Sequence, residues 1–448
     1  MDTQLAPALS KEAEVYRVRT PASARFFAEA RKFLPGGDSR STLFYPPYPA
    51  VFERGAGCRV VDLDGNELLD FTGNHSSLVH GYGHPAILEA VKQQLQKGSC
   101  FPGSTEPQLR MARLLCERIS AMDLVRFANS GTEASMNAIR AARAFTGRTR
   151  IAKVEGGYHG TMDEVMVSVH PSDAEAGQRT QPKAIPSSQG LAPDTTESVL
   201  VLPFNDVEGA AALIEQAAGE LAAVLVEPVL GSAGMIPAER PYLEMLREST
   251  RRHGIVLVFD EVVSFRVAYG GAQQHFQVSP DITCLGKLIG GGFPLGAFGG
   301  RSDIMALFDP SRGRPAIPHP GSYNANPVGL VAGAVTLELL TPPVIERMNL
   351  KGKLLREDLE AAFTHAGIPA RITGLGSLFA IHLKEQPVRS YRDTLGSAAE
   401  LRHEIFLGLF NEGILIDPRG VGNVSSVIGD REMQQFSGAI RTVLARLS

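Results

Sequence analysis

Short runs of apolar, often β-branched residues recur through the middle of the chain, separated by amphipathic segments. Six of these runs are too short for typical helices and fit strands buried on both faces: 125–128, 151–154, 199–202, 222–226, 255–259 and 282–285. Other segments have apolar residues at helical spacing, including 85–95, 106–119 and an alanine-rich stretch that stops at Gly147. Strands that alternate with helices predict an α/β fold with a mostly parallel sheet.

The two ends of the chain have a different pattern, in which long helices accompany only short strands. The N-terminal part predicts a helix at 21–33 and a hairpin at 58–69. The C-terminal part predicts helices and short strands at 327–340, 344–366, 371–381, 414–416 and 431–447. We therefore expect a smaller α+β lobe beside the main sheet. The expected units are an N-terminal segment (1–75), a large domain (76–325) and a C-terminal small domain (326–448).

One long segment, 170–197, is rich in Pro, Ser, Gln, Asp and Glu and has no apolar periodicity. Because strands resume after it, we interpret it as a surface loop or lid and not as a linker between domains. The pattern leaves open whether this segment becomes ordered when a ligand binds.

Composition narrows the class of protein. A chain of 448 residues that is 44% apolar can bury a large core, and a formal net charge of −4 gives no preference for nucleic acid. The four cysteines form no CxxC pair, and we find neither a signal sequence nor a run of 18 apolar residues. We therefore expect a cytoplasmic protein that does not contact a membrane. His75, His80 and His84 lack carboxylate or cysteine partners at ligand spacing, so no metal site is expected.

The candidate chemistry lies where two of the predicted strands end. Asp260 and Glu261 follow the strand at 255–259, and Lys287 follows the strand at 282–285. Open α/β sheets bind ligands at this edge. Pyridoxal phosphate (PLP) needs a lysine for a Schiff base with its aldehyde and a carboxylate for its pyridine nitrogen. The alternative is that Asp260 caps the next helix and Lys287 lies on the surface.

A second candidate feature is the turn that follows the strand at 125–128. The small polar residues 129–132 open a helix there, and a helix N-terminus favours an anion such as phosphate. The alternative is an ordinary N-cap that serves only the helix. Further on, Tyr158 lies in a glycine-rich turn, where its ring can cover a flat ligand or simply pack within the loop.

Six motifs occur in one order along the chain: NSGTEA (129–134), GGYHG (156–160), VEP (226–228), DEV (260–262), LGKLIGGG (285–292) and GSYNANP (321–327). In this order, and over nearly the whole chain, they resemble class III aminotransferases, which are fold type I PLP enzymes. The resemblance implies an α/β large domain with a mostly parallel, seven-stranded sheet between helices. It also implies a small α+β lobe built from both ends of the chain, and an obligate homodimer with shared active sites.

The resemblance also assigns roles to individual residues. Lys287 would form the Schiff base and shuttle protons, and Asp260 would pair with the pyridine nitrogen. The remaining cofactor contacts would be Tyr158 and Val262 on the two ring faces, and Ser130, Gly131 and Thr132 on the phosphate. Ser322 occupies a position that is usually threonine and that reaches the phosphate of the neighbouring subunit. Glu227 would support these residues without contacting the cofactor, and no chemical step is assigned to it.

The substrate is less constrained by the motifs. The stretch 266–300 is most similar to glutamate-1-semialdehyde aminomutase, but that enzyme carries an acidic residue shortly after a C-terminal turn where this chain has Arg419 and no following acid. Arg419 and the segment 38–45 instead resemble β-phenylalanine aminotransferase. Arg40 and Arg419 can each bind a carboxylate through two parallel hydrogen bonds, and Phe44 and Tyr45 can form apolar walls. The alternative is that both arginines make surface or interface ion pairs.

We therefore predict a PLP-dependent aminotransferase. It would move an amino group from a β-amino acid or a bulky amine to a 2-keto acid, by a ping-pong mechanism through Lys287. The first alternative is glutamate-1-semialdehyde 2,1-aminomutase, which transfers the amino group within one molecule. The second is a non-catalytic protein that keeps the fold as a binding or regulatory module. A dehydrogenase is disfavoured because no GxGxxG motif follows an early strand.

Overall fold

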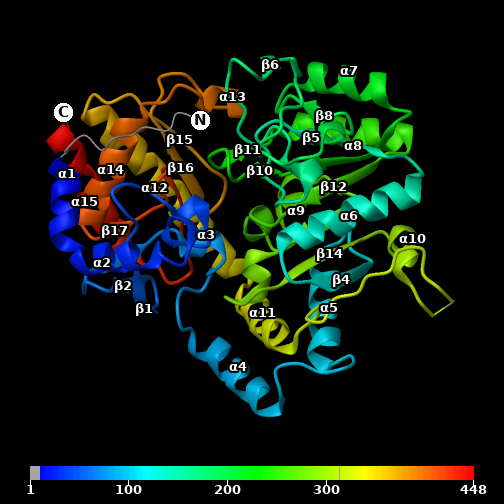
Figure 1. Ribbon diagram of the computed structural model, residues 1–448, viewed down its shortest axis with the longest axis horizontal. Coiled ribbons are helices and arrows are strands. Elements are labelled where there is room, and N and C mark those ends of the chain that lie inside the picture. The colour runs from blue at the N-terminus through cyan, green and yellow to red at the C-terminus, as the bar shows by residue number, and fades with distance from the viewer. Residues whose placement is uncertain (1–10, 312, 448) are drawn as a thin grey trace.

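The computed structural model describes residues 11–311 and 313–447, and this part of the chain forms two lobes (Figure 1). The blue N-terminal and orange-red C-terminal elements lie together in one lobe, while the cyan-to-yellow middle of the chain forms the other. This division confirms the expected α/β large domain with a smaller lobe from both ends. Within the described residues no single helix has the length and apolarity of a membrane span. The helices α11 (Pro327–Leu339) and α12 (Pro342–His365) pass that test only as a pair, which is bent by 77°.

The large lobe is built on one seven-stranded sheet. The strand order is β4 (Leu124–Ala128), β14 (Gly296–Gly300), β13 (Ile282–Leu285), β12 (Val256–Asp260), β9 (Leu221–Val226), β5 (Arg150–Val154), β8 (Val199–Leu202). β14 runs antiparallel to both of its neighbours, and the strands from β13 to β8 are mutually parallel. The six predicted strands are confirmed. β14 is not predicted, because the run GAFGG looks like a glycine-rich loop.

Helices cover both faces of this sheet. Alternate residues of β12 belong to different cores: Val258 packs with the alanines of α6 (Gly131–Thr146), while Leu257 and Phe259 pack with α7 (Val207–Ala217) and α8 (Arg240–His253). Both faces of β12 are therefore buried, as the continuous apolar run predicts for a strand of a parallel sheet. The same alternation sends Asp260, the last residue of β12, and Glu261, which follows it, to opposite sides of the sheet.

The second lobe contains two small sheets and several helices. One sheet has the order β1 (Phe52–Ala56), β2 (Arg59–Asp62), β3 (Glu67–Asp70), β17 (Ile414–Leu415), and the other has the order β15 (Arg371–Thr373), β16 (Leu378–His382), β18 (Val421–Asn423). β17 pairs in parallel with β3, which joins the two ends of the chain in one sheet. The helices here are α1 (Lys11–Arg19), α2 (Pro21–Ala30), α12 (Pro342–His365), α13 (Tyr391–Thr394), α14 (Ala399–Asn411) and α15 (Asp430–Leu447).

The remaining helices of the large lobe form a separate layer. α11 (Pro327–Leu339) shares a core with α5 (Glu106–Arg118), in which Leu330 and Leu337 pack with Met111 and Leu115. α4 (Pro85–Lys97) packs on another part of α11. The predicted domain boundaries remain predictions, but α11, which they assign to the C-terminal domain, packs with the large lobe. The other short elements are α3 (Gly73–Ser76), α9 (Ala272–Phe276), α10 (Ser302–Met305), β10 (Val229–Leu230) and β11 (Ile236–Pro237).

The segment 170–197 is anchored to α13. It contains a short hairpin, β6 (Gly177–Gln178) with β7 (Gln181–Pro182). From α13, whose Tyr391 packs in the core of the large lobe, the Tyr391 hydroxyl donates to the Pro171 carbonyl at 2.8 Å and Arg392 donates to the Ala176 carbonyl at 2.7 Å. Arg392 also forms a buried ion pair with Glu155, at 2.8 Å, just after β5. The surface loop or lid that the sequence pattern predicts is therefore fixed by side chains of α13 in the structure.

Candidate active site

Asp260 and Lys287 reach the same edge of the sheet. Asp260 ends β12 and is paired in register with Cys284 of β13, three residues before Lys287. Asp260 is buried, whereas Lys287 is partly exposed and has a φ of 48°, in the left-handed region that non-glycine residues rarely adopt. Strain of this kind concentrates at functional positions. Burial lowers the pKa of Lys287 despite the opposing charges of Asp260 and Glu227, which favours the neutral, nucleophilic amine.

A histidine that the sequence motifs do not single out orients Asp260. Nδ1 of His159 lies 2.9 Å from Oδ2 of Asp260, and the Val262 amide donates to Oδ1 at 3.0 Å. Burial lowers the pKa of His159, and since a carboxylate only accepts, the neutral imidazole donates from Nδ1. Nε2 then has no hydrogen-bond partner within the described residues. His159 adjoins Tyr158 in the GGYHG motif, which is the signal that could have identified it.

The predicted anion site lies beside this carboxylate. Ser130 is the N-cap of α6, and its hydroxyl accepts from the Glu133 amide at 3.1 Å, so the N-cap interpretation holds for this side chain. The backbone N–H groups of Gly131 and Thr132 belong to the first turn, which a helix cannot pair internally. A Cβ at Gly131 would come within 3.0 Å of Val262, and one at Gly160 within 2.3 Å of the Thr132 hydroxyl. The glycines therefore let these three motifs meet.

The two remaining acids near the site have different surroundings. Glu261 is fully buried on the other side of the sheet, where it accepts from the Gln273 amide and side chain, each at 3.0 Å, at the start of α9. Glu227 accepts from the amides of Tyr158 at 2.8 Å and Gly231 at 3.1 Å. Burial and the charge of Asp260 raise the pKa of Glu227 to about 8. Glu227 thus fixes the backbone of the Tyr158 turn, which agrees with its expected supporting role.

A fully buried lysine lies behind the site. Lys153, on β5, donates to the carbonyls of Val154 at 3.2 Å and Val167 at 2.7 Å. Burial lowers its pKa to about 7, against the charges of Glu227 and Glu155. Between about pH 7 and pH 10 the unfolded chain therefore binds a proton at this position that the folded chain does not, so the free energy of unfolding should rise with pH across this window.

We expect Lys153→Met to remove this contribution. The free energy of unfolding of the wild type should gain about 1.4 kcal/mol per pH unit relative to the variant between about pH 7 and pH 10. Urea unfolding of both proteins across this range measures the difference. Lys353→Met, at an exposed lysine paired with Glu357, should leave the wild-type slope unchanged. Parallel curves for wild type and Lys153→Met would show that Lys153 is charged in the folded protein.

The predicted substrate arginines lie around the turn that carries Asn74 and His75. Nη1 of Arg40 donates to Oδ1 of Asn74 at 2.9 Å. Arg419 forms a two-point ion pair with Asp417, with distances of 2.8 and 3.0 Å, and His75 lies 3.6 Å from the same carboxylate. The structure therefore brings both predicted arginines to one turn, Arg40 through Asn74 and Arg419 through Asp417.

The two predicted apolar wall residues are placed differently from each other. Phe44 is exposed. Tyr45 is only 7% exposed and lies in the core of the small lobe. There its hydroxyl is 3.1 Å from that of Tyr16, and its ring packs edge-on against Phe406. Tyr45 therefore presents no pocket wall in this structure, because the alternation of side chains along 44–45 sends one ring outward and the other inward.

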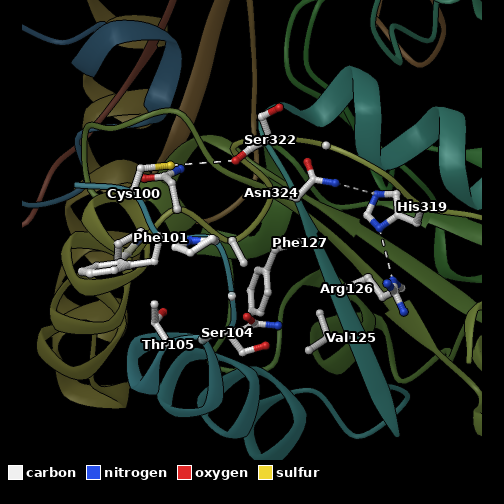
Figure 2. A pocket seen from close by; sticks show the side chains of 17 residues that line it. Cys100, Phe101, Ser104, Thr105, Val125, Arg126, Phe127, His319, Ser322 and Asn324 are labelled. Carbon is white, nitrogen blue, oxygen red and sulfur yellow. Dashed lines mark hydrogen bonds between the residues drawn. The ribbon is translucent and has the colours of Figure 1, made fainter. Parts of the chain in front are cut away.

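Ser322 lines a cavity that none of the other predicted cofactor residues lines. It is exposed beside a cavity of about 520 Å³ whose lining also includes Cys100, Arg126, His319 and Asn324 (Figure 2). Figure 2 shows Asn324 and Arg126 both directed toward the His319 ring, at 3.3 and 3.2 Å. Asn324 also accepts from Asn129 at 3.1 Å, which links this cavity to the turn before α6. Within one chain, then, Ser322 does not join the group around Lys287.

The residues at the sheet edge fit PLP. A Cβ at Gly131 or Gly286 would fill the space between the first turn of α6 and Val262. Because both residues are glycines, this space stays open, as a bound phosphate would require. Asp260 is held by two donors on one side of the same edge, and the amine of Lys287 has a lowered pKa. Tyr158 is 40% exposed, so its ring remains available to a ligand. Burial and the charges of Asp260 and Glu227 raise the pKa of its hydroxyl.

Comparison with known proteins gives an independent test. The family model for aminotransferase class-III matches residues 44–444. A glutamate-1-semialdehyde 2,1-aminomutase of Methanothermobacter thermautotrophicus is 40% identical over 397 residues, covering 88% of this chain and 92% of that protein. A beta-phenylalanine transaminase of Variovorax paradoxus is 39% identical over 432 residues, covering 96% of this chain and 94% of that protein.

A solved structure agrees. That of an omega-transaminase from Sphaerobacter thermophilus has a TM-score of 0.93 and 46% sequence identity, covering 96% of this chain and 99% of the other. The match to the family thus runs through nearly the whole sequence, and the whole fold superposes on a transaminase. This chain therefore belongs to the class III aminotransferases, enzymes that use pyridoxal phosphate.

Proposed function

We propose that this enzyme transfers the amino group of a β-amino acid, or of an amine with a bulky apolar substituent, to a 2-keto acid. The observation that carries the proposal is the pair of arginines at one turn: Arg40 donates to Asn74, and Asp417, which holds Arg419, lies 3.6 Å from His75. Glutamate-1-semialdehyde has one carboxylate. A β-amino acid donor and a 2-keto acid acceptor carry their carboxylates at different distances from the reacting carbon, which calls for two cationic positions.

When bound, PLP supplies an aldehyde for the amino group and a protonated ring that withdraws electrons from the reacting carbon. Lys287, whose pKa is lowered by burial, provides the neutral amine that takes a proton from that carbon and returns it. Asp260, fixed by His159 and the Val262 amide, keeps a proton on the ring nitrogen. Tyr158 and Val262 cover the ring faces and exclude water, and the turn at 130–132 binds the phosphate.

The rival function is an intramolecular aminomutase, and the relatives include both activities. A panel of β-amino acids and amines, each with pyruvate or 2-oxoglutarate, distinguishes the two when it is run beside glutamate-1-semialdehyde alone. The proposal predicts product only where donor and acceptor are both present. Turnover of the semialdehyde without any acceptor would reject the proposal in favour of the aminomutase.

We expect Arg40→Ala to raise KM for β-amino acids by about 10-fold or more, because it removes a charge-assisted hydrogen bond to their carboxylate. KM for amines without a carboxylate should stay within about twofold. Steady-state kinetics with matched acid and amine donors measure the split, and Arg240→Ala, at an exposed arginine paired with Glu244, is the control. An equal loss for both donor classes would assign Arg40 a structural role.

We further propose that the enzyme works as a homodimer in the cytoplasm. Ser322 is exposed and lies apart from the site of its own chain, as expected for a residue that reaches the phosphate of a second copy. The free cysteines Cys58, Cys100, Cys116 and Cys284 suit a reducing compartment. Sedimentation equilibrium should give twice the chain mass, and Ser322→Ala should weaken PLP retention on dialysis without changing that mass.

A further inference from the structure

The turn Gly73–Ser76 has an unusual backbone. Its four residues have φ values of 49°, 49°, 53° and 70°, so a full turn of chain is left-handed although three of the residues are not glycine. L-residues in this conformation cost roughly 1 kcal/mol each and persist only where the surroundings fix them. Here buried Asp70 accepts from the Gly73 amide, and fully buried Arg266 donates to the Ser76 carbonyl at 3.3 Å.

This turn directs two consecutive side chains, Asn74 and His75, toward Arg40 and toward the partner of Arg419. Asn74 accepts from Arg40, and His75 lies 3.6 Å from Asp417, the carboxylate that holds Arg419. A right-handed turn or an extended strand would point these two side chains elsewhere. The strained turn therefore contacts Arg40 directly, and it approaches Arg419 through the carboxylate of Asp417.

Asp417 holds Arg419 by one edge only. Nε and Nη2 of Arg419 donate to the two carboxylate oxygens, while Nη1 faces the Ser232 hydroxyl at the weak distance of 3.4 Å. The Asp417 side chain is 6% exposed and that of Arg419 is 39% exposed, so the carboxylate is buried while part of the arginine side chain reaches solvent. A guanidinium has five donors in a fixed fork, so the Nη1–Nη2 edge can still bind a second carboxylate.

We infer that Asp417 is a positioning residue and built-in counter-ion for Arg419, so that one pocket can bind either a carboxylate or an uncharged group. This inference rests on the proposed function, which requires the pocket to accept a keto acid in one half of the reaction and a bulky apolar substituent in the other. Without Asp417, an uncharged group would leave Arg419 as a partly buried, unpaired cation, which is strongly unfavourable. With Asp417 in place, the pair is neutral before any ligand arrives.

The charged groups around Asp417 support this arrangement. Burial alone would raise its pKa, but the hydrogen bonds and charge of Arg419 outweigh burial and leave the pKa lowered, so the carboxylate stays ionised. Burial lowers the pKa of His75, which therefore adds a polar contact without a second positive charge. Arg402 also faces the pair, and burial lowers its pKa. The negative charge of Asp417 is thus balanced mainly by Arg419.

The test compares two unreactive ligands on the PLP-loaded enzyme. Arg40→Ala is present throughout, so that the carboxylate cannot bind at Arg40, and the enzyme with that change alone is the reference. Isothermal calorimetry gives Kd for 3-phenylpropionate, an anion, and for 3-phenylpropionamide, its uncharged analogue. In Asp417→Asn, which keeps the acceptor for the Arg419 amide and Nε, the ratio of Kd for the amide to Kd for the anion should rise about 10-fold or more. An unchanged or lower ratio, or equal weakening of both ligands, would overturn the inference.

Two further variants separate charge from shape. When Arg419→Gln is combined with Asp417→Asn in the same background, the raised ratio should fall back to the reference value or below, since the bare cation is gone. Asp358→Asn, which breaks an ion pair with Arg441 elsewhere on the small lobe, should leave the ratio unchanged. Failure of the donor panel would reject the proposed function, whereas a successful panel with an unchanged ratio would reject only this inference.

Discussion

We expect Lys287→Ala to lower kcat by about 10³-fold or more with every donor that the wild type accepts. In the proposed function the amine of Lys287, just past β13, supplies both the attachment for the cofactor and the base for the reacting carbon. The other lysine buried close by, Lys153, cannot substitute, because its amine is engaged by the carbonyls of Val154 and Val167. Initial rates with saturating donor and keto acid measure the loss.

The control for Lys287→Ala is Lys353→Ala, which removes an exposed amine far along α12 and should leave kcat within about twofold. After borohydride reduction, mass spectrometry should find the cofactor attached to the wild type and to the control but not to Lys287→Ala. Attachment at another lysine, or activity within 10-fold of wild type, would show that the amine at 287 is not the reactive one.

The central architecture could be predicted because it follows from local pattern. The strands β9, β12 and β13 are continuous apolar runs, and only a central parallel sheet buries both faces of such strands. The residues that follow these strands then lie at one edge by topology alone. For this reason the sequence is sufficient to predict that Asp260 and Lys287, which are 27 residues apart by their numbering, share one site.

What could not be predicted depends on contacts between distant segments. β14 reads as a glycine-rich loop, yet a Cβ at Gly296 would lie 2.1 Å from the Ser130 carbonyl and one at Gly300 would lie 2.0 Å from that of Asp281. Those glycines are needed for close approach, which no periodicity reveals. Tyr45 looks like a pocket residue from its motif, but the Tyr16 and Phe406 contacts that bury it come from residues far away in the sequence.

The left-handed turn at Gly73–Ser76 is a further example, and it leads to Arg266. The segment 73–85 has no apolar periodicity and is typical of a loop. A loop prediction does not say whether the backbone of residues 73–76 is left-handed or right-handed. The handedness is held by two partners, Asp70 just before the turn and Arg266 from a distant part of the chain. Arg266, six residues beyond Asp260, is completely buried, and it connects the strand that carries Asp260 to this turn and to the small lobe.

We expect Arg266→Met to lower the free energy of unfolding by about 4 kcal/mol. Nε donates to the Ser377 hydroxyl at 2.9 Å, and Nη1 donates to Oδ1 of Asn423 at 2.8 Å and to the Ser76 carbonyl at 3.3 Å. Nη2 donates to the Val424 carbonyl at 2.5 Å. Methionine fills similar space and leaves all four buried acceptors unpaired, each at a cost of roughly 1–3 kcal/mol, offset in part because no guanidinium is then desolvated.

Urea unfolding at fixed protein concentration measures this loss, and Arg251→Met, at an arginine whose side chain is 74% exposed, should stay within about 0.5 kcal/mol of wild type. Arg266→Lys should recover only part of the loss, because an ammonium cannot reach acceptors that lie in four directions. In the folded fraction of Arg266→Met, KM for carboxylate substrates should rise, since Asn74 and His75 lose the turn that positions them. If stability falls while KM is unchanged, the turn keeps its handedness without Arg266, and Asp70 alone is sufficient to hold it.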